Sequence, residues 1–445
     1  MSTNLSKLRR DELLGKIEQI RAFLNKSLYD ENVQKLSGYL NELAAEVKGK
    51  KYGLVFEEHR EKIDDTLEAS VPVLTEDAGL FVDGGGEVNF LLEGDNLASL
   101  YLLEKTHKGK IDVIYIDPPY NTGNKDFIYD DDFVNTEDAF RHSKWCSFIT
   151  KRLQIAKILL KENGFIFISI DDNEQSDLRL ICNEIFGEEN FVANIPTIMN
   201  LKGNQDEYGF AGTHEYTIVY AKNKSVGNLG LFKIDENDEE FSKWEEDEIG
   251  YFKKGANLKS TGINAPREKR PNLFFPIYVC KDGSFSVDEK LEDSTEIFPI
   301  TDEKEMSWRW SKDKFRSEKH NVIISQEDGK FAIYKKQRPE LGDLPTKKAK
   351  SIFYRPEYSS GNGTVQLKEI FGAKVFNTPK PIDLIKDFLQ LSTFNSQFST
   401  VLDFFAGSGT TGHAVLKLNA EDGGHRHFIL CTNNENGICR DITYE

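Results

Sequence analysis

An aspartate followed by two prolines and a tyrosine, Asp117-Pro118-Pro119-Tyr120, is the segment of this chain best suited to do chemistry. It directly follows residues 111–116, which are apolar except for Asp112 and typical of a strand buried on both faces. Two prolines fix φ and remove backbone donors, so they stiffen a loop at the carboxyl end of that strand. Open α/β sheets bind their ligands at that edge.

Such a segment suits the activation of an exocyclic amino group on a nucleobase. The lone pair of that nitrogen is delocalised into the ring, which makes it a poor nucleophile. If the Asp117 carboxylate and the Pro118 carbonyl accept its two N–H hydrogens, the nitrogen becomes pyramidal and can attack a methyl donor in line. Positioning and electrostatics then suffice, and we expect no metal. Tyr120 would stack on a base flipped out of the duplex. The alternative is a rigid proline turn without chemistry.

A glycine-rich turn is the second candidate site. Residues 401–412 predict a strand, a tight turn with G-x-G-x-x-G spacing and a helix start. The motif alone is weak, since a plain strand-to-helix turn can have it. S-adenosylmethionine has no phosphate, and Asp403 suits a ligand with ammonium or hydroxyl groups better than a diphosphate. We therefore predict that this turn binds S-adenosylmethionine through Asp403, Phe405, Ala406, Gly407, Ser408, Gly409, Thr410 and Thr411.

Two further acids could contact the same cofactor. Glu435 follows a predicted strand at 428–432, where an acid can bind ribose hydroxyls. The alternative is an acid in a loop without that role. If residues 88–92 supply an outer strand beyond 428–432, Asp95 lies near the cofactor adenine, although Gly-Asp-Asn is equally typical of a turn.

Composition limits the classes of protein that the chain can belong to. The five cysteines are scattered and lack C-x-x-C spacing, which argues against a disulfide framework or a zinc site and for a reducing cytoplasm. The N-terminus is polar, and no apolar run has the roughly 18 residues of a membrane helix. The formal net charge of −17 is awkward for a DNA-binding protein, but basic residues cluster in mid-chain. We predict a DNA-binding face there, against the alternative of solvated surface runs; its residues are Lys253, Lys254, Lys269, Arg270, Lys335 and Lys336.

Alternation of apolar strands with helical segments predicts an α/β fold with a doubly wound, mostly parallel sheet. The polar middle of the chain breaks this pattern and reads as an inserted domain. The predicted parts are a helical N-terminal region at 1–82, the catalytic half of the core at 83–221, an insert at 222–355 and the cofactor-binding half at 356–445.

These motifs resemble the β class of DNA adenine-N6 methyltransferases, in which the catalytic segment precedes the cofactor loop and a target-recognition insert lies between them. Residues 52–57 and 428–436 further resemble the modification (Mod) subunit of type III restriction-modification systems. Residues 376–381 resemble the family segment that lies against the methionine end of the cofactor, which assigns Thr378 and Lys380 to it. The residues at 171–174 also fit the family pattern.

The resemblance implies a bacterial, cytoplasmic homodimer that methylates adenine in double-stranded DNA with S-adenosylmethionine and partners a restriction (Res) subunit. Type III modification subunits usually continue beyond residue 445, so a truncated, catalytically silent DNA- or cofactor-binding subunit is the alternative. Cytosine-N4 enzymes of this motif order more often have Ser at the position of Asp117. A methyltransferase acting on RNA or a protein amide fits less well, and a nicotinamide oxidoreductase leaves the Asp-Pro-Pro-Tyr segment unexplained.

Overall fold

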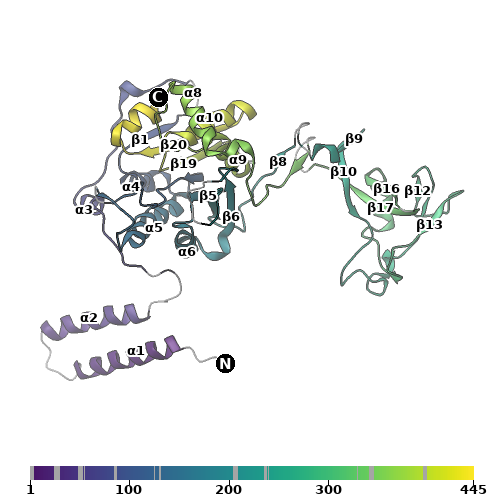
Figure 1. Cartoon of the computed structure of the whole chain (residues 1–445). Helices are drawn as coiled ribbons and strands as arrows, with labels where there is room; N and C mark the ends of the chain where they lie inside the picture. The colour runs from purple at the N-terminus through teal and green to yellow at the C-terminus, as the bar shows by residue number, and fades with distance from the viewer. Residues whose placement is uncertain are drawn as a thin grey trace. The chain divides into compact units, whose positions relative to one another are not determined.

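The computed structural model describes residues 5–24, 31–48, 54, 56–84, 88–124, 126–129, 132–203, 209–234, 238, 240–327, 329–339, 345–393 and 398–445. The chain divides into two compact units (Figure 1). The first unit comprises Met1–Gly227, Thr400–Gly409 and Phe428–Glu445. The second comprises Asn228–Ser399 and Thr410–His427. The domain boundaries proposed from the sequence do not follow this division and stay predictions.

A seven-stranded sheet forms the centre of the first unit, with strand order β1-β20-β19-β2-β5-β7-β6. The pairs β1/β20, β19/β2 and β2/β5 are parallel, whereas β7 runs antiparallel to both β5 and β6. The predicted α/β class with a mostly parallel sheet is therefore confirmed. The strands are β1 (Phe90–Glu93), β2 (Ile111–Ile116), β5 (Leu160–Ile170), β6 (Phe191–Ile198), β7 (His214–Ala221), β19 (Phe398–Asp403) and β20 (His425–Thr432).

The outer strand expected at 88–92 is confirmed, because Phe90 pairs with Ile429 in parallel register. Strand β6 at the other edge was not predicted. It contains Asn194 and Pro196, and proline within a strand is tolerated at an edge but hides the strand in the sequence pattern. Two small strands, β3 (Ile128–Tyr129) and β4 (Asp132–Phe133), form a separate hairpin.

Helices α4, α5 and α6 pack against each other and against the apolar strands of the sheet. Leu97, Leu100 and Leu103 of α4 are buried, as their helical spacing predicts. The predicted helix at 137–160 begins only at Arg141. The helices of this unit are α1 (Leu5–Leu24), α2 (Glu31–Lys48), α3 (Lys62–Ala69), α4 (Asn96–His107), α5 (Arg141–Leu159) and α6 (Gln175–Phe186), and the chain ends with a π-helix at Ile438–Tyr444.

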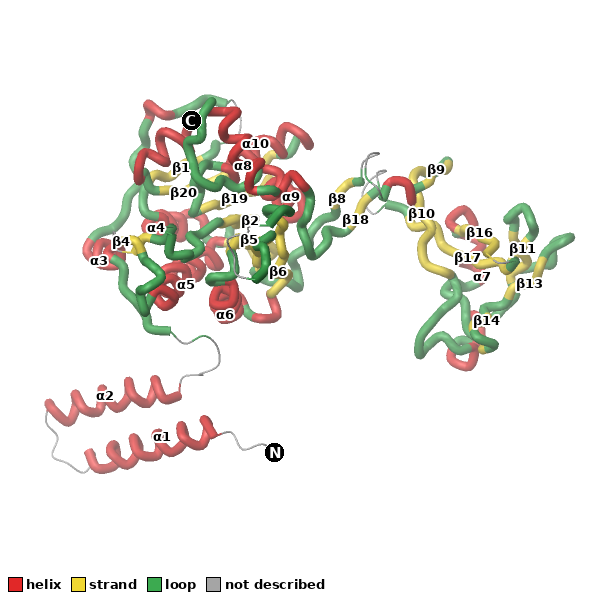
Figure 2. The backbone as a smooth tube through the Cα atoms, in the orientation of Figure 1, coloured by secondary structure: helices red, strands yellow, loops and turns green. Residues whose placement is uncertain are grey.

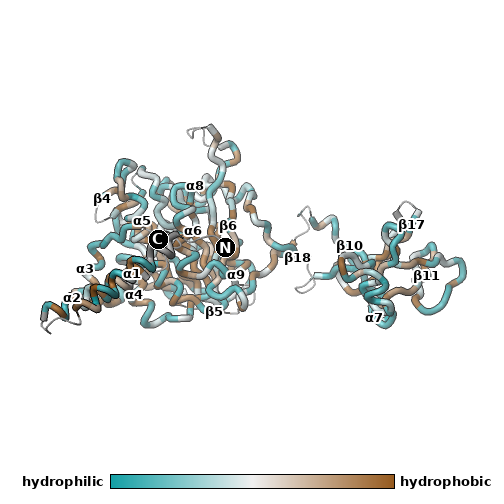
Figure 3. The backbone as a smooth tube through the Cα atoms, turned by 90° about the horizontal axis from the view of Figure 1, so that it is seen from below, coloured by the Kyte–Doolittle hydropathy of each residue, from teal (hydrophilic) through white to brown (hydrophobic). Residues whose placement is uncertain are grey.

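Helices α1 and α2 pack on one another through Ile17, Leu40 and Ala44. Hydrophobic and hydrophilic residues mix along both helices (Figure 3), as expected of a hairpin that buries one side. Among the described residues, every helix is too short or too polar to cross a membrane.

Strands and loops dominate the inserted part of the second unit (Figure 2). Short strands β8 (Phe232–Lys233) and β18 (Thr346–Lys347) pair where the insert begins and ends. The insert has its own core, in which Phe275, Trp308 and Phe315 are buried. Its other elements are β9 (Glu245–Asp247), β10 (Gly250–Asn257), β11 (Ile277–Val279), β12 (Phe285–Ser286), β13 (Thr295–Ile297), β14 (Ile300–Thr301), β15 (Lys304–Glu305), α7 (Lys312–Ser317), β16 (Val322–Glu327) and β17 (Lys330–Gln337).

The second unit also holds α8 (Ser360–Phe371), α9 (Ile382–Ser392) and α10 (Thr410–Asp422), of which α9 and α10 pack together. Helix α8 was not predicted, because its first residues, Ser-Gly-Asn-Gly, have low helix propensity. The close approach of Gly363 to the Pro379 carbonyl explains one of these glycines: a Cβ there would lie 2.2 Å from that oxygen.

Candidate active site

The two segments singled out in the sequence leave neighbouring parallel strands at the same edge of the sheet. Asp117-Pro118-Pro119-Tyr120 follows β2, and residues 404–409 follow β19, which pairs with β2 at Leu402 and Ile114. Burial, followed by the negative charges of Asp117, Glu215 and Asp403, holds the pKa of Tyr115 well above its usual range. The hydroxyls of Tyr115 and Ser169 are hydrogen-bonded at 2.9 Å, which fixes the Tyr115 ring near this edge of the sheet.

Tyr120 is half-buried, and its hydroxyl donates to Glu215 Oε2 at 3.2 Å. Burial, followed by the charges of Asp117 and Glu215, holds the pKa of Tyr120 well above its usual range. The tyrosine therefore stays neutral. It can act as an aromatic surface and a hydrogen-bond donor, but not as a base.

Side chains from α5 and α6 hold the loop that contains the two prolines. Trp145 Nε1 donates to the Pro119 carbonyl at 2.7 Å. Asn121 is fully buried with φ of +58° and donates through Nδ2 to Glu174 Oε1 at 2.5 Å and to the Arg141 carbonyl at 3.2 Å. Asparagine is one of the few residues other than glycine that adopt positive φ readily. The Asp-Pro-Pro-Tyr segment is thus anchored on both sides of Tyr120.

Glu174 is the buried centre of this support. Burial raises the pKa of its carboxyl to about 8, and the charge of Asp177 adds to the effect. His142 Nδ1 lies 2.7 Å from Glu174 Oε1, and Arg141 Nε donates to His142 Nε2 at 3.0 Å. Burial, together with the charge of Arg141, lowers the pKa of His142, which favours a neutral ring that donates from Nδ1 to Glu174. Ligand atoms of His142, Glu174 and Asp177 lie within 4.8 Å of one another, so these groups are also the candidate metal ligands among the described residues.

The glycine turn has the conformation that its residues permit. Gly407 and Gly409 have φ of +52° and +79°, values that other residues rarely adopt. The turn is closed by hydrogen bonds from Gly409 N to the Ala406 carbonyl at 2.8 Å and from Phe405 N to Asp403 Oδ1 at 2.9 Å. Thr443 Oγ1 donates to the Gly407 carbonyl at 2.7 Å, so the last helical segment of the chain packs on the turn.

The other residues predicted to bind the cofactor are less clearly assigned. The Asp95 carboxylate accepts from Leu97 N at 2.8 Å and Ala98 N at 3.1 Å and so caps α4, and its contact with the cofactor stays a prediction. Glu435 is exposed in the turn after β20. Four predicted contacts belong to the second unit and stay predictions: Thr378, Lys380, Thr410 and Thr411.

Four of the six predicted DNA-binding residues lie on the paired strands β10 and β17, where Lys254 is opposite Lys336. Lys336 forms an ion pair with Asp247 at 2.5 Å, so it is engaged within the protein. Asp247 also pairs with Arg338 at 2.8 Å. These partners hold the pKa of Asp247 far below its usual range. Lys336 is consequently the least suited of the set to bind phosphate. Lys253 lies on β10 and Lys335 on β17. Lys269 and Arg270 lie in an exposed 3₁₀ segment.

Sequence patterns did not single out Asn121, Trp145, Glu215 or Thr443 as parts of the site, and Glu174 appeared only within the family resemblance. Each acts through a contact with a residue far away in the sequence. The one local signal was Asn121 after a rigid Pro-Pro-Tyr turn, since asparagine is common where φ is positive. The resembling residues 52, 53 and 55 lie outside the described part of the chain, whereas Leu54 and Phe56 pack against the main core.

Comparison with solved structures finds DNA methyltransferases. The chain aligns with the cytosine-N4-specific PvuII DNA methyltransferase at 12% identity and a TM-score of 0.39, over 78% of this chain and 83% of the other. It aligns with the M1.HpyAVI-SAM complex at 13% identity and a TM-score of 0.36, over 80% and 96%.

Sequence comparison is more specific. The chain is 48% identical over 376 residues to the type III restriction-modification enzyme EcoPI Mod subunit of Escherichia phage P1, which covers 78% of this chain and 58% of that protein. It is 34% identical over 355 residues to the type II methyltransferase M.KpnI of Klebsiella pneumoniae, which covers 79% and 82%. The predicted resemblance to type III Mod subunits is confirmed, although the chain spans little more than half the length of the Mod relatives that it matches. The model of the N6/N4 methyltransferase family, described as DNA methylase, matches residues 111–443, so the chain belongs to this family.

Proposed function

We propose that the protein transfers a methyl group from S-adenosylmethionine to the N6 amino group of adenine in duplex DNA, as the modification subunit of a type III restriction-modification system. The observation that carries the proposal is the meeting of two motifs at one sheet edge, Asp117 to Tyr120 after β2 and the glycine turn after β19. Neither motif alone would support it.

The glycine turn fits the cofactor. Asp403 is buried at the end of β19, and positive φ at Gly407 and Gly409 leaves main chain without side chains at the same edge. A carboxylate and bare backbone suit a ligand that carries an ammonium group, a carboxylate and ribose hydroxyls. When bound, S-adenosylmethionine supplies an electrophilic methyl group.

Asp117 and the Pro118 carbonyl would accept the two N–H hydrogens of the target amine. The Pro119 carbonyl is already bound by Trp145, so it serves to fix the loop and not to bind the base. Tyr120, held by Glu215, would stack on the flipped base while remaining neutral. Adenine is favoured over cytosine because Asp and not Ser stands at position 117.

By analogy with the Mod relatives, the biological partners of the protein would be double-stranded DNA and a restriction subunit. A homodimer and a place in the bacterial cytoplasm belong to the same proposal. The proposal also includes two sets of contacts. S-adenosylmethionine would contact Asp95, Glu435, Thr378 and Lys380, and DNA would contact the six basic residues of the insert.

The test is methyl transfer from labelled S-adenosylmethionine to unmethylated duplex DNA, with the modified nucleoside identified after digestion. N6-methyladenine is the expected product. Asp117→Asn keeps the shape of the side chain and should lower turnover by at least about 100-fold while calorimetry shows unchanged cofactor binding. N4-methylcytosine as product would overturn the choice of base. Cofactor binding without any transfer by the wild type would favour a catalytically silent subunit.

A further inference from the structure

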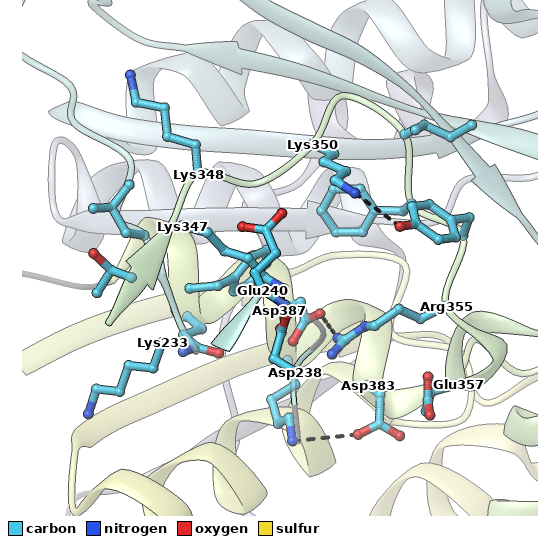
Figure 4. A pocket seen from close by; sticks show the side chains of 18 of the residues that line it. Lys233, Asp238, Glu240, Lys347, Lys348, Lys350, Arg355, Glu357, Asp383 and Asp387 are labelled. Carbon is cyan, nitrogen blue, oxygen red and sulfur yellow. Dashed lines mark hydrogen bonds and ion pairs between the residues drawn. The ribbon is translucent and has the colours of Figure 1, made fainter. Parts of the chain in front are cut away.

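A groove of about 650 Å³ lies wholly within the second unit, where the insert begins and ends. The ribbon of β8 and β18 forms part of it, together with the segment that follows β18 and the first turns of α9 (Figure 4). Among the described residues that line it, eight are basic and five are acidic, in a chain whose net charge is −17. This excess of positive charge is local and opposes the charge of the whole molecule.

Three of the five acids are neutralised by neighbours. Asp387 is buried and accepts hydrogen bonds from Arg355 and Tyr358. Asp383 pairs with Lys417 at 3.2 Å, and Asp238 pairs with Lys347. The remaining acids are Glu240 and Glu357.

Several of the lysines are not used in this way. Lys233 and Lys348 are exposed and form no ion pair with any residue that the structure describes. In Figure 4 their ammonium groups point away from the labelled carboxylates. Lys350 donates to the Tyr354 hydroxyl at 3.1 Å, and this hydrogen bond, with the nearby charges of Glu240 and Asp238, raises the pKa of Lys350. The groove therefore presents two exposed ammonium groups, of Lys233 and Lys348, that form no ion pair within the described part of the chain.

Exposed apolar surface lies beside these lysines. Tyr354 is 49% exposed and Ile352 is 43% exposed, and Lys350 Nζ lies 5.3 Å from the centre of the Tyr354 ring. Ammonium groups and an exposed aromatic ring that line one groove are a combination that contacts the phosphates and the sugars or bases of a nucleic acid.

We propose that this groove binds the phosphodiester backbone of the DNA substrate, with Lys233 and Lys348 as phosphate ligands and Tyr354 as an apolar contact. The proposal rests on the proposed function and adds to it a binding surface distinct from most of the residues predicted from the sequence. Of those, only Lys253 lines the groove. Backbone contacts of this kind fix the position of the duplex and do not recognise its sequence.

The test compares two double variants of the full chain with the wild type. Lys233→Ala with Lys348→Ala removes two charges from the groove, and Lys281→Ala with Lys290→Ala removes two exposed charges from the β11–β13 region of the same insert. Binding to a fluorescent duplex is measured by anisotropy over a series of salt concentrations. Methyl transfer at saturating DNA and cofactor binding are measured in parallel.

We expect the groove variant to bind DNA about tenfold more weakly near 0.1 M salt. The magnitude of the negative slope of log K against log salt should decrease by about 2. Cofactor affinity and turnover at saturating DNA should not change, and the control variant should behave as the wild type. Equal weakening in both variants, or wild-type affinity and slope in the groove variant, would overturn the groove while leaving the methyltransferase function intact. If inorganic phosphate binds the groove tightly and DNA affinity is insensitive to the variant, the groove is an anion site instead. A wild type that neither binds nor methylates DNA would refute the proposed function itself.

Discussion

Replacing Glu174 by glutamine should change how the stability of the protein depends on pH. The pKa of this carboxyl is raised from 4.5 to about 8, first by burial and then by the charge of Asp177. At about 1.36 kcal/mol per pKa unit, this difference corresponds to roughly 5 kcal/mol as an upper limit. The groups that face Glu174 are Asn121 on the catalytic loop, His142 and Arg141 on α5, and Asp177 on α6.

The sign follows from proton binding. Below pH 4.5 the carboxyl is protonated in both the folded and the unfolded chain, and above about 8 it is ionised in both. Between these values the folded protein binds more protons, so its free energy of unfolding falls as the pH rises. Glutamine is neutral at every pH and keeps an oxygen that can accept from Asn121. The stability of Glu174→Gln relative to the wild type should therefore increase steadily from pH 5 to pH 8.5.

The measurement is urea unfolding at pH 5, 7 and 8.5, followed by tryptophan fluorescence, to which Trp145 beside the loop contributes. Glu184→Gln is the control, because Glu184 is an exposed acid of the same helix. The difference between the Glu174 variant and the wild type should change by a few kcal/mol over this range, whereas the control should follow the wild type. If the difference in the free energy of unfolding between the Glu174 variant and the wild type does not change with pH, the argument that burial raises the pKa of Glu174 is refuted.

Three further outcomes are expected. Gly409→Ala places a side chain at φ of +79° and a Cβ 3.3 Å from the Thr443 carbonyl oxygen, so it should cost about 1–3 kcal/mol and weaken cofactor binding in calorimetry; unaltered binding would mean that the turn does not hold the cofactor. Tyr120→Phe keeps the ring and should retain most methyl transfer, while Tyr120→Ala should lose about 10- to 100-fold in kcat/KM for DNA; equal activity of the two would exclude stacking. Trp308→Ala should destabilise the insert by about 3–5 kcal/mol and expose it to limited proteolysis while cofactor binding persists, and loss of that binding would show that the two units do not fold independently.

The elements that carry the chemistry could be predicted because their signals are local. Residues 111–116 are apolar except for Asp112, and they form a strand in the middle of the sheet. The glycines at 407 and 409 permit the positive φ that the turn requires. The pairing of β1 with β20 could be predicted because both segments have the apolar pattern of strands and an outer strand was needed beside β20. Strand β6 and helix α8 escaped because proline in one and glycines in the other oppose their local propensity, and tertiary contacts override it.

The supports of the site could not be predicted in the same way. Lys336 appeared as a free cation in a basic run, yet it is bound by Asp247, a residue 89 positions away. Asp95 stood in a segment that suited either a ligand or a turn, and only the geometry shows that it caps α4. A charge in the sequence indicates a possible partner, but the fold decides whether that partner is a ligand or another side chain.

The loop at 117–121 shows why a rigid catalytic segment needs supports from elsewhere. Pro118 and Pro119 have no N–H groups, so the main chain of the loop has few donors with which to hold itself against the sheet. Side-chain hydrogen bonds supply the missing contacts: Trp145 of α5 donates to the Pro119 carbonyl, and the loop's own Asn121 donates to Glu174 and to the main-chain carbonyl of Arg141. The position of the acceptor groups at Asp117 and Pro118 therefore depends on the packing of α5 and α6. Substitutions at Trp145 or Glu174 should lower turnover before they lower cofactor affinity, because the glycine turn is held through other residues, Thr443, Cys431 and Asn96.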